Sequence, residues 1–312
     1  MSIKLKVVSE KKFKNGNTDN QLHLNFKGKD VNCIIINTLR RTLLDLIPIH
    51  GFDPEDISIK TNTSVYNNDI IRLRLSAFPL YEINNHLELV DEINKIQNKN
   101  LKEESLDKLS IFFSKKNEGN NKVHLTTDDC EFYMGDKKID SIYKTPLLIV
   151  PLNPGQEIRG DCKSSVGIGL HSGIYQAVQI CCYEEINLNE YILKFESRGQ
   201  LSEKDLLKRA CLIIENKIQV LKDKFSANII NGNKLELTIK NEDHTLGNLI
   251  TYYLQDNKSV TYAGYKMDHP LKREIDLHLE SNGSKKIKTI ILDTFDIIID
   301  TFKKIRTLIK KS

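Results

Sequence analysis

Two stretches of this 312-residue chain repeat one pattern of apolar and polar residues. In each stretch a run with period two, which is typical of a half-buried strand, leads into a segment with helical spacing. A turn and a second period-two run follow. The first stretch comprises residues 21–26, 37–44 and 57–59, and the second comprises residues 234–239, 244–250 and 275–279. We therefore predict a strand, helix, turn and strand in each half of the chain.

A later amphipathic helix is predicted to complete each unit. Ser202, with Asp205 three positions on, resembles a capping box and marks a helix start before a stripe of apolar residues that ends at Phe225. A second stripe runs from Ile287 to Ile309. Because such stripes must be buried, the two units are expected to bury their apolar faces against each other. The predicted fold class is α+β.

The residues at the two predicted helices carry a family resemblance. Residues 37–41 read Asn-Thr-Leu-Arg-Arg, and with residues 72–80 they resemble the third-largest subunit of eukaryotic RNA polymerase II. That family includes the archaeal D subunit and the amino-terminal domain of the bacterial alpha subunit. Residues 244–248 read His-Thr-Leu-Gly-Asn, and with residues 263–266 they resemble the eleventh subunit, archaeal L. The chain thus resembles a fusion of two subunits that pair with each other, a form similar to that of large DNA viruses.

The resemblance implies a discontinuous domain layout. A β-rich domain is expected to interrupt the first of two alpha-like dimerisation units, which pair within one chain. The expected parts are the first unit at 1–50 and 185–228, the inserted domain at 51–184, a linker at 229–233 and the second unit at 234–312. Within the insert, residues 84–122 are rich in Asn and Lys and are expected to form a variable loop with at most one helix. That stretch has no cysteine, so the zinc loop that related subunits often carry is not expected.

The function implied by the resemblance is assembly. The family provides a non-catalytic platform on which the second-largest (beta-like) and largest (beta-prime-like) polymerase subunits associate, together with small adaptor subunits. No catalytic residue, cofactor or metal is expected on this chain, and nucleic acid would be reached only through the complex. The expected location is intracellular: a viral factory and the virion for a viral protein, or the nucleus for a cellular eukaryotic one.

Two other classes of function remain as alternatives. A free nucleic-acid-binding protein is disfavoured because 46 basic residues nearly balance 42 acidic ones. An enzyme is disfavoured because no paired carboxylates, metal-ligand cluster or phosphate loop has suitable spacing. The six cysteines lack metal-site spacing, and no apolar run approaches the length of a membrane span.

Arg40 and Arg41 are the principal candidates for binding a partner. Adjacent residues lie about 100° apart around a helix, so one arginine can brace the domain while the other reaches outward. A solvated helix face is the alternative. The resemblance favours an interface with the beta-like subunit. It also implies that Lys163 and His171 face a protein partner. Packing between the two units is assigned to Asn37, Leu39, Leu43, Leu246, Asn248 and Leu249.

Overall fold

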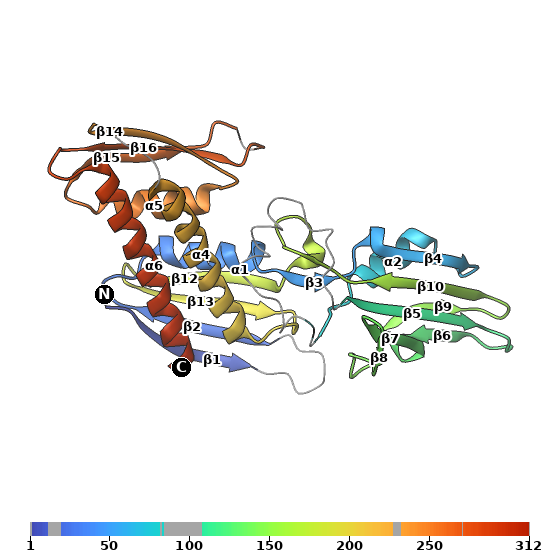
Figure 1. Cartoon of the computed structure of the whole chain (residues 1–312). Helices are drawn as coiled ribbons and strands as arrows, with labels where there is room; N and C mark the ends of the chain where they lie inside the picture. Colours follow the sequence, from blue (N-terminus) through green and yellow to red (C-terminus); the bar gives the residue numbers. More distant parts are fainter. Residues whose placement is uncertain are drawn as a thin grey trace.

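The computed structural model describes residues 2–11, 20–81, 83, 108–226, 232–269 and 271–311. Its elements form two lobes that lie side by side (Figure 1). The larger lobe contains both chain ends, four helices and two sheets. The smaller lobe is built on a five-stranded sheet from the middle of the chain.

A four-stranded antiparallel sheet forms the base of the larger lobe. Its strands are β1 (Lys4–Lys11), β2 (Gln21–Lys27), β12 (Val178–Asn187) and β13 (Glu190–Ser197), in the order β1-β2-β13-β12. The two central strands pair buried residues on one face: Leu24 lies opposite Leu193, and Phe26 opposite Tyr191. This period-two burial is what places an apolar surface beneath the helices.

Helix α1 (Cys33–Asp45) lies over β12 and β13. Asn32 caps its first turn, since its side-chain oxygen accepts a hydrogen bond from the Ile35 N–H at 2.9 Å. Helix α4 (Glu203–Ser226) begins after Ser202, whose Oγ accepts from the Asp205 N–H at 3.2 Å and donates to the Asp205 carboxylate at 2.6 Å. The predicted helix start at Ser202 is thus confirmed.

The carboxy-terminal part repeats a sheet-and-helix arrangement. Its elements are β14 (Lys234–Lys240), α5 (His244–Gln255), β15 (Val260–Lys266), β16 (Glu274–Ser281) and α6 (Ile287–Lys311). The antiparallel sheet has the order β14-β16-β15, and α5 packs on β15. Gly247 permits this close approach, because a Cβ there would lie 2.6 Å from the Tyr265 ring.

The smaller lobe is a five-stranded antiparallel sheet of order β4-β10-β5-β7-β8. These strands are β4 (Ile57–Asn62), β5 (Leu109–Lys116), β7 (Cys130–Met134), β8 (Lys137–Ile139) and β10 (Glu157–Lys163). One face is covered by helix α2 (Asn68–Ser76) and by the pair β6 (Val123–Thr126) and β9 (Leu148–Leu152). Short 3-10 turns occupy Pro54–Asp56, Thr127–Asp129 and Gly173–Tyr175.

The lobes are joined by backbone pairing and by one arginine. Strands β3 (Ile49–Gly51) and β11 (Ser165–Gly167) pair between them. The Arg198 guanidinium donates to the carbonyl of Ile174 at 3.2 Å and to that of Ala77 at 3.4 Å. Each lobe nevertheless has its own cluster of buried apolar residues.

The structure corrects three expectations. The run at 57–59 is a strand, but it pairs with β10 within the range 51–184 expected for the inserted domain, so the first stretch does not form one strand, helix, turn and strand unit. Residues 109–116, expected within a loop, form the central strand β5, whereas 84–107 lie outside the described residues. The second stretch, expected to have only a turn between its helix and the run at 275–279, also contains the strand β15 there.

Two predicted domain boundaries can be located in the structure. The boundary between residues 184 and 185 falls inside β12, because that strand begins at Val178 in the sheet of the larger lobe. The linker is described only at residues 232–233.

Candidate functional site

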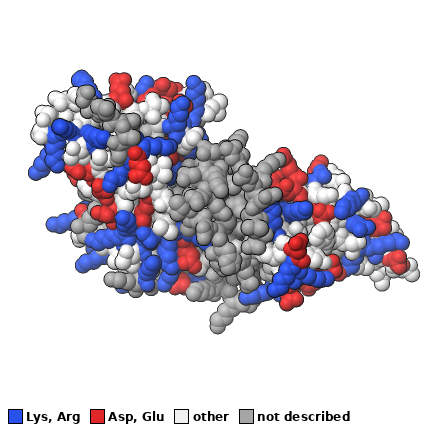
Figure 2. Space-filling view, in the orientation of Figure 1, with Lys and Arg blue, Asp and Glu red and all other residues white. Residues whose placement is uncertain are grey.

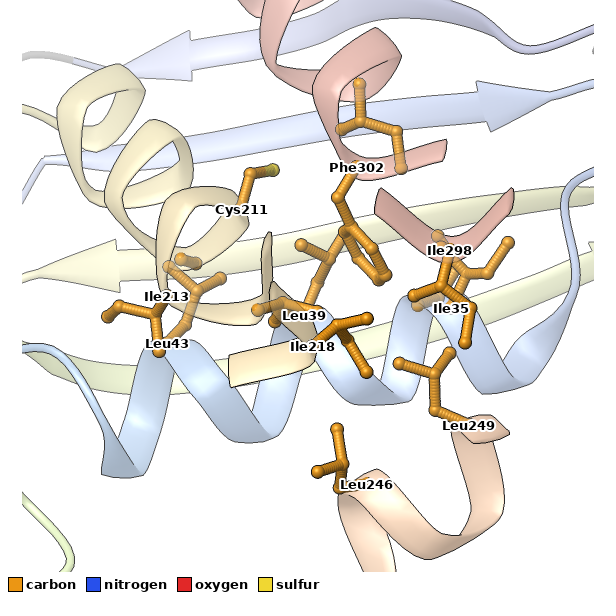
Figure 3. Packing of buried hydrophobic residues seen from close by; sticks show 14 of the residues in the cluster. Ile35, Leu39, Leu43, Cys211, Ile213, Ile218, Leu246, Leu249, Ile298 and Phe302 are labelled. Carbon is orange, nitrogen blue, oxygen red and sulfur yellow. The ribbon is translucent and has the colours of Figure 1, made fainter. Parts of the chain in front are cut away.

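The amino-terminal and carboxy-terminal parts of the larger lobe meet along a helical seam. Helix α1 packs against α5, and α4 packs against α6 along much of its length. Leu246 and Leu249 point from α5 toward α1 (Figure 3). Leu39, Leu43 and Leu249 are fully buried, and Leu246 is nearly so. Burial of one such leucine stabilises by about 1.5–3 kcal/mol, so this seam has a strong apolar driving force.

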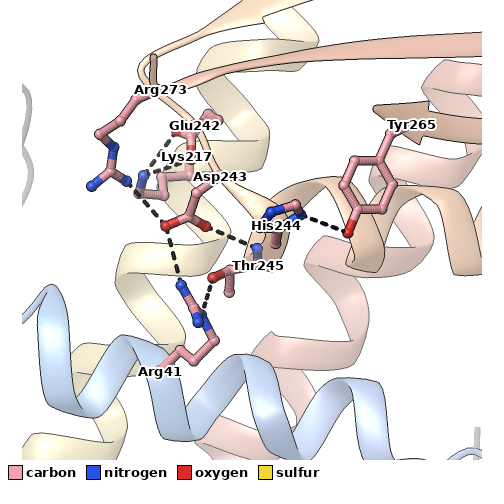
Figure 4. A network of polar contacts seen from close by, with 8 residues as sticks. All are labelled: Arg41, Lys217, Glu242, Asp243, His244, Thr245, Tyr265 and Arg273. Carbon is pink, nitrogen blue, oxygen red and sulfur yellow. Dashed lines mark hydrogen bonds and ion pairs between the residues drawn. The ribbon is translucent and has the colours of Figure 1, made fainter. Parts of the chain in front are cut away.

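A polar network closes one end of the seam (Figure 4). Asp243 caps α5: one carboxylate oxygen accepts from the Thr245 N–H at 2.8 Å, while the other faces Arg41 at 3.4 Å and Arg273 at 3.2 Å. The Arg41 Nε also donates to the Thr245 Oγ1 at 2.6 Å. Arg41 therefore binds the start of α5 and braces the two parts against each other.

The pKa values of two carboxylates in this network are shifted in opposite directions. Burial alone would raise the pKa of Asp243, but hydrogen bonds from Thr245 and the charges of Arg41 and Arg273 hold that pKa below its ordinary value. Burial raises the pKa of Glu242, and Lys217 offsets only part of the effect. Lys217 Nζ lies 2.8 Å from the Glu242 carboxylate, so the pair joins α4 to the loop before α5.

A second ion pair joins α4 to α6. Arg306 forms two hydrogen bonds with Glu215, from Nε at 3.0 Å and from Nη2 at 2.9 Å. The glutamate is almost buried, and removal of either partner would leave the other charge poorly compensated. This fork geometry fixes the register in which the two long helices pack.

Arg40 differs from its neighbour in what it contacts. Its Nε donates to the Asn37 Oδ1 on the same helix at 2.9 Å, and it remains partly exposed. Burial raises the pKa of Cys181 to about 12, and the nearby Arg40 charge opposes the rise. Arg40 therefore lies at the boundary between α1 and β12, where part of its surface remains open.

The edge strand β12 carries exposed apolar side chains on both faces: Tyr183 lies opposite the buried Leu193 on the face toward α1, and Ile180 lies opposite Glu196 on the other face. Ile180, Tyr183, Ile186 and Leu188 are exposed, and Leu188 in the turn after the strand is 79% exposed. The adjacent cysteines point to opposite faces, since Cys181 is buried and Cys182 exposed. An edge strand also presents unpaired backbone groups, so this is a surface suited to protein association. Its sequence alternates like any strand, and only the sheet order shows that β12 is an edge.

The two asparagines assigned to packing lie at the margin of the seam. Asn37 and Asn248 both line a cavity of about 100 Å³ between α1 and α5, together with Arg41 and His244. Asn248 is exposed, in contrast to the buried leucines near it. Asn37 instead orients Arg40.

Lys163 and His171 are exposed but do not share a surface element. Lys163 ends β10 in the smaller lobe. His171 lies in a loop that is tied to the end of α1, because the Leu170 N–H donates to the Asp45 carbonyl at 2.9 Å. The structure thus brings the His171 loop to α1 and leaves Lys163 on a separate sheet.

The described part of the chain contains no group of three His, Cys, Asp or Glu side chains arranged to hold a metal ion. None of its described helices is both long and apolar enough to cross a membrane. Basic and acidic side chains are interspersed over both lobes (Figure 2).

Comparison with known proteins supports one family. Residues 234–307 match the model of the RNA polymerase Rpb3/Rpb11 dimerisation domain. Over 342 aligned residues, which cover 99% of this chain and 94% of the relative, the chain is 25% identical to a protein of Acanthamoeba polyphaga mimivirus named as a DNA directed RNA polymerase subunit.

Two archaeal relatives match shorter parts of the chain. The chain is 39% identical over 67 residues to the RNA polymerase subunit Rpo11 of Saccharolobus shibatae, covering 22% of this chain and 73% of that subunit. It is 48% identical over 52 residues to Rpo11 of Metallosphaera sedula, covering 17% of this chain and 58% of that subunit.

Proposed function

The chain belongs to the Rpb3/Rpb11 family of RNA polymerase subunits, and we propose that it is the non-catalytic platform on which the large subunits of its polymerase assemble. In this proposal the amino-terminal sheet with α1 and α4 is a third-subunit-like unit, and residues 234–312 are its eleventh-subunit-like partner. The smaller lobe is a domain inserted in the first unit.

The observation that carries the proposal is the pairing of α1 with α5 and of α4 with α6. Those contacts bury the apolar stripes of both units in one core. A partner subunit is therefore not required to cover the seam, and the remaining apolar surface is free to bind other chains. Subunits that pair as separate chains lose translational freedom when they associate. Two units on one chain avoid that loss.

We infer that the beta-like subunit binds the surface formed by Arg40 and the exposed side chains of β12. A guanidinium can pair with a partner carboxylate in bidentate geometry, and the exposed apolar side chains of the edge strand provide area to bury. The largest subunit and small adaptor subunits are expected at other surfaces. The proposed role does not include Arg41 as a direct partner contact, because Arg41 is already bound to Thr245 and Asp243.

Charge reversal tests this surface. Arg40→Glu should reduce capture of the co-expressed second-largest subunit at least about tenfold, since a charged hydrogen-bond partner is replaced by a like charge. Lys240→Glu is the matched control: Lys240 is exposed on β14 of the other sheet. Quantitative pull-down with the tagged chain measures both. Equal capture by Arg40→Glu and Lys240→Glu would reject the assigned surface.

A further inference from the structure

A broad groove lies on the face of the five-stranded sheet that α2 does not cover. Its volume is about 880 Å³, and strands β4, β10, β5 and β7 contribute its lining. Phe112 and Tyr133 form an aromatic pair there, with ring centres 5.5 Å apart and ring planes at 88°. Phe112 is 40% exposed, because it points to the opposite face of β5 from its buried neighbours Ile111 and Phe113.

Most carboxylates in and beside this groove are already paired with lysines. Lys60 lies 3.0 Å from Asp161, and Lys138 lies 2.7 Å from Glu131. Lys115 also pairs with Asp129 at 2.5 Å. Asp136 has no such pair among the described residues. It lies in the turn between β7 and β8, near the edge of the sheet opposite to β4 and β10.

Two cations in the groove have no anionic partner within the described ranges. Arg159 and Lys163 are both exposed on β10 and line the groove. They lie four residues apart on one strand and on the same face, a separation of about 13 Å. Phe112 lies directly opposite Asp161, the residue midway between them. The groove therefore presents two positive charges on β10, with the Asp161–Lys60 ion pair between them and the exposed Phe112 ring beside that pair on β5.

We propose that this groove binds an extended acidic segment of a partner protein. Two carboxylates four residues apart in an extended segment span about the same 13 Å and point to the same side as the residue midway between them. An apolar or aromatic side chain at that middle position would lie on Phe112 and Tyr133. The two carboxylates would then reach Arg159 and Lys163.

A protein segment fits this groove better than single-stranded nucleic acid. Exposed aromatic rings and cations can bind bases and phosphates in general. Here, however, Lys60, Arg159 and Lys163 share the lining with Asp129, Glu131 and Asp136. A continuous phosphate backbone would pass close to those carboxylates, whereas two discrete carboxylates can avoid them. The inference is independent of the platform role, because the strands that line the groove and the strand β12 belong to different lobes (Figure 1).

Binding of a defined peptide to the purified full chain tests the proposal. The probe is a fluorescein-labelled peptide with the core Glu-Val-Phe-Val-Glu, and the comparison peptide has Gln at both Glu positions. We expect the charged peptide to bind at least about tenfold more tightly than the amide peptide, because each charged hydrogen bond adds to its affinity. Fluorescence anisotropy gives both affinities.

Variants of the chain assign the binding to the groove. Arg159→Gln together with Lys163→Gln should remove the preference for the charged peptide, and Phe112→Ser should weaken both peptides. Lys137→Gln is the control, because Lys137 is exposed on β8 and points away from the face that holds Tyr133 and Lys138. Circular dichroism checks that each variant keeps its fold.

Three results would contradict the proposal. The first is no binding of the charged peptide up to about 1 mM. The second is binding that the groove variants leave unchanged relative to Lys137→Gln. The third is tight, salt-sensitive binding of a labelled oligo(dT) strand that depends on Arg159 and Lys163, which would identify a nucleic-acid site instead. A failed peptide test would leave capture of the second-largest subunit unaffected.

Discussion

At the scale of single residues, neighbours in sequence take different roles. Arg41 is bound to Asp243 and Thr245 across the seam, whereas Arg40 contacts its own helix and stays partly open. The angle between adjacent helix positions predicts such a division, but not which arginine faces which way. That depends on where α5 lies, a contact across more than 200 positions. The sequence therefore indicates the pair, and the fold assigns the roles.

Replacement of Asp243 by Asn separates the contribution of its charge to stability from the contribution of its helix cap. Asn also caps helices well, so Asp243→Asn should keep the Thr245 hydrogen bond and lose the attraction to Arg41 and Arg273. We expect a loss of about 1 kcal/mol in the free energy of unfolding at pH 7, because both ion pairs are partly exposed. Urea unfolding followed by circular dichroism measures it.

The same variant has a defined pH dependence. The pKa of Asp243 is lower in the folded protein than its ordinary value of 3.8, so its charge stabilises the fold above that value. This contribution is lost as the pH falls through the lowered pKa. The difference between wild type and Asp243→Asn should therefore be constant from pH 7 to about pH 5 and shrink below about pH 4. A difference that persists unchanged at pH 3 would contradict the electrostatic account.

At the scale of elements, periodicity predicts the helices and the strands that carry them. The runs at 21–26, 234–239 and 275–279 are strands, and the segments at 37–44 and 244–250 lie in α1 and α5. Strand pairing was less predictable. The run at 57–59 has the right alternation but pairs with β10, about 100 positions away. Alternation predicts a buried face, whereas it contains no information about the partner strand.

The buried leucines of the seam give a prediction at this scale. Leu249→Ala should lower the free energy of unfolding by about 3 kcal/mol, because the site is fully buried and a cavity would remain. Leu271→Ala is the control for the same substitution, since Leu271 is 88% exposed and should change stability by less than about 0.5 kcal/mol. Urea unfolding of both variants tests the seam. Similar values for the two would show that α5 does not depend on this packing.

At the scale of the whole molecule, one chain holds a paired helical core, an open edge beside Arg40 and a second lobe with its own groove. The sequence indicates the paired core, because both apolar stripes and both motifs are local patterns. It does not indicate the β12 surface or the groove. Both depend on sheet order, and the groove forms where Phe112 on β5 lies opposite Asp161 on β10. Surfaces made by distant strands are therefore the part that required the structure.

The most direct test of the platform role is purification of the tagged chain from its native source, with mass spectrometry of the bound proteins and a promoter-independent transcription assay. We predict recovery of two very large polymerase subunits in equal amounts with the chain, together with RNA synthesis by the purified complex. A chain recovered alone, or with partners that synthesise no RNA, would contradict the account.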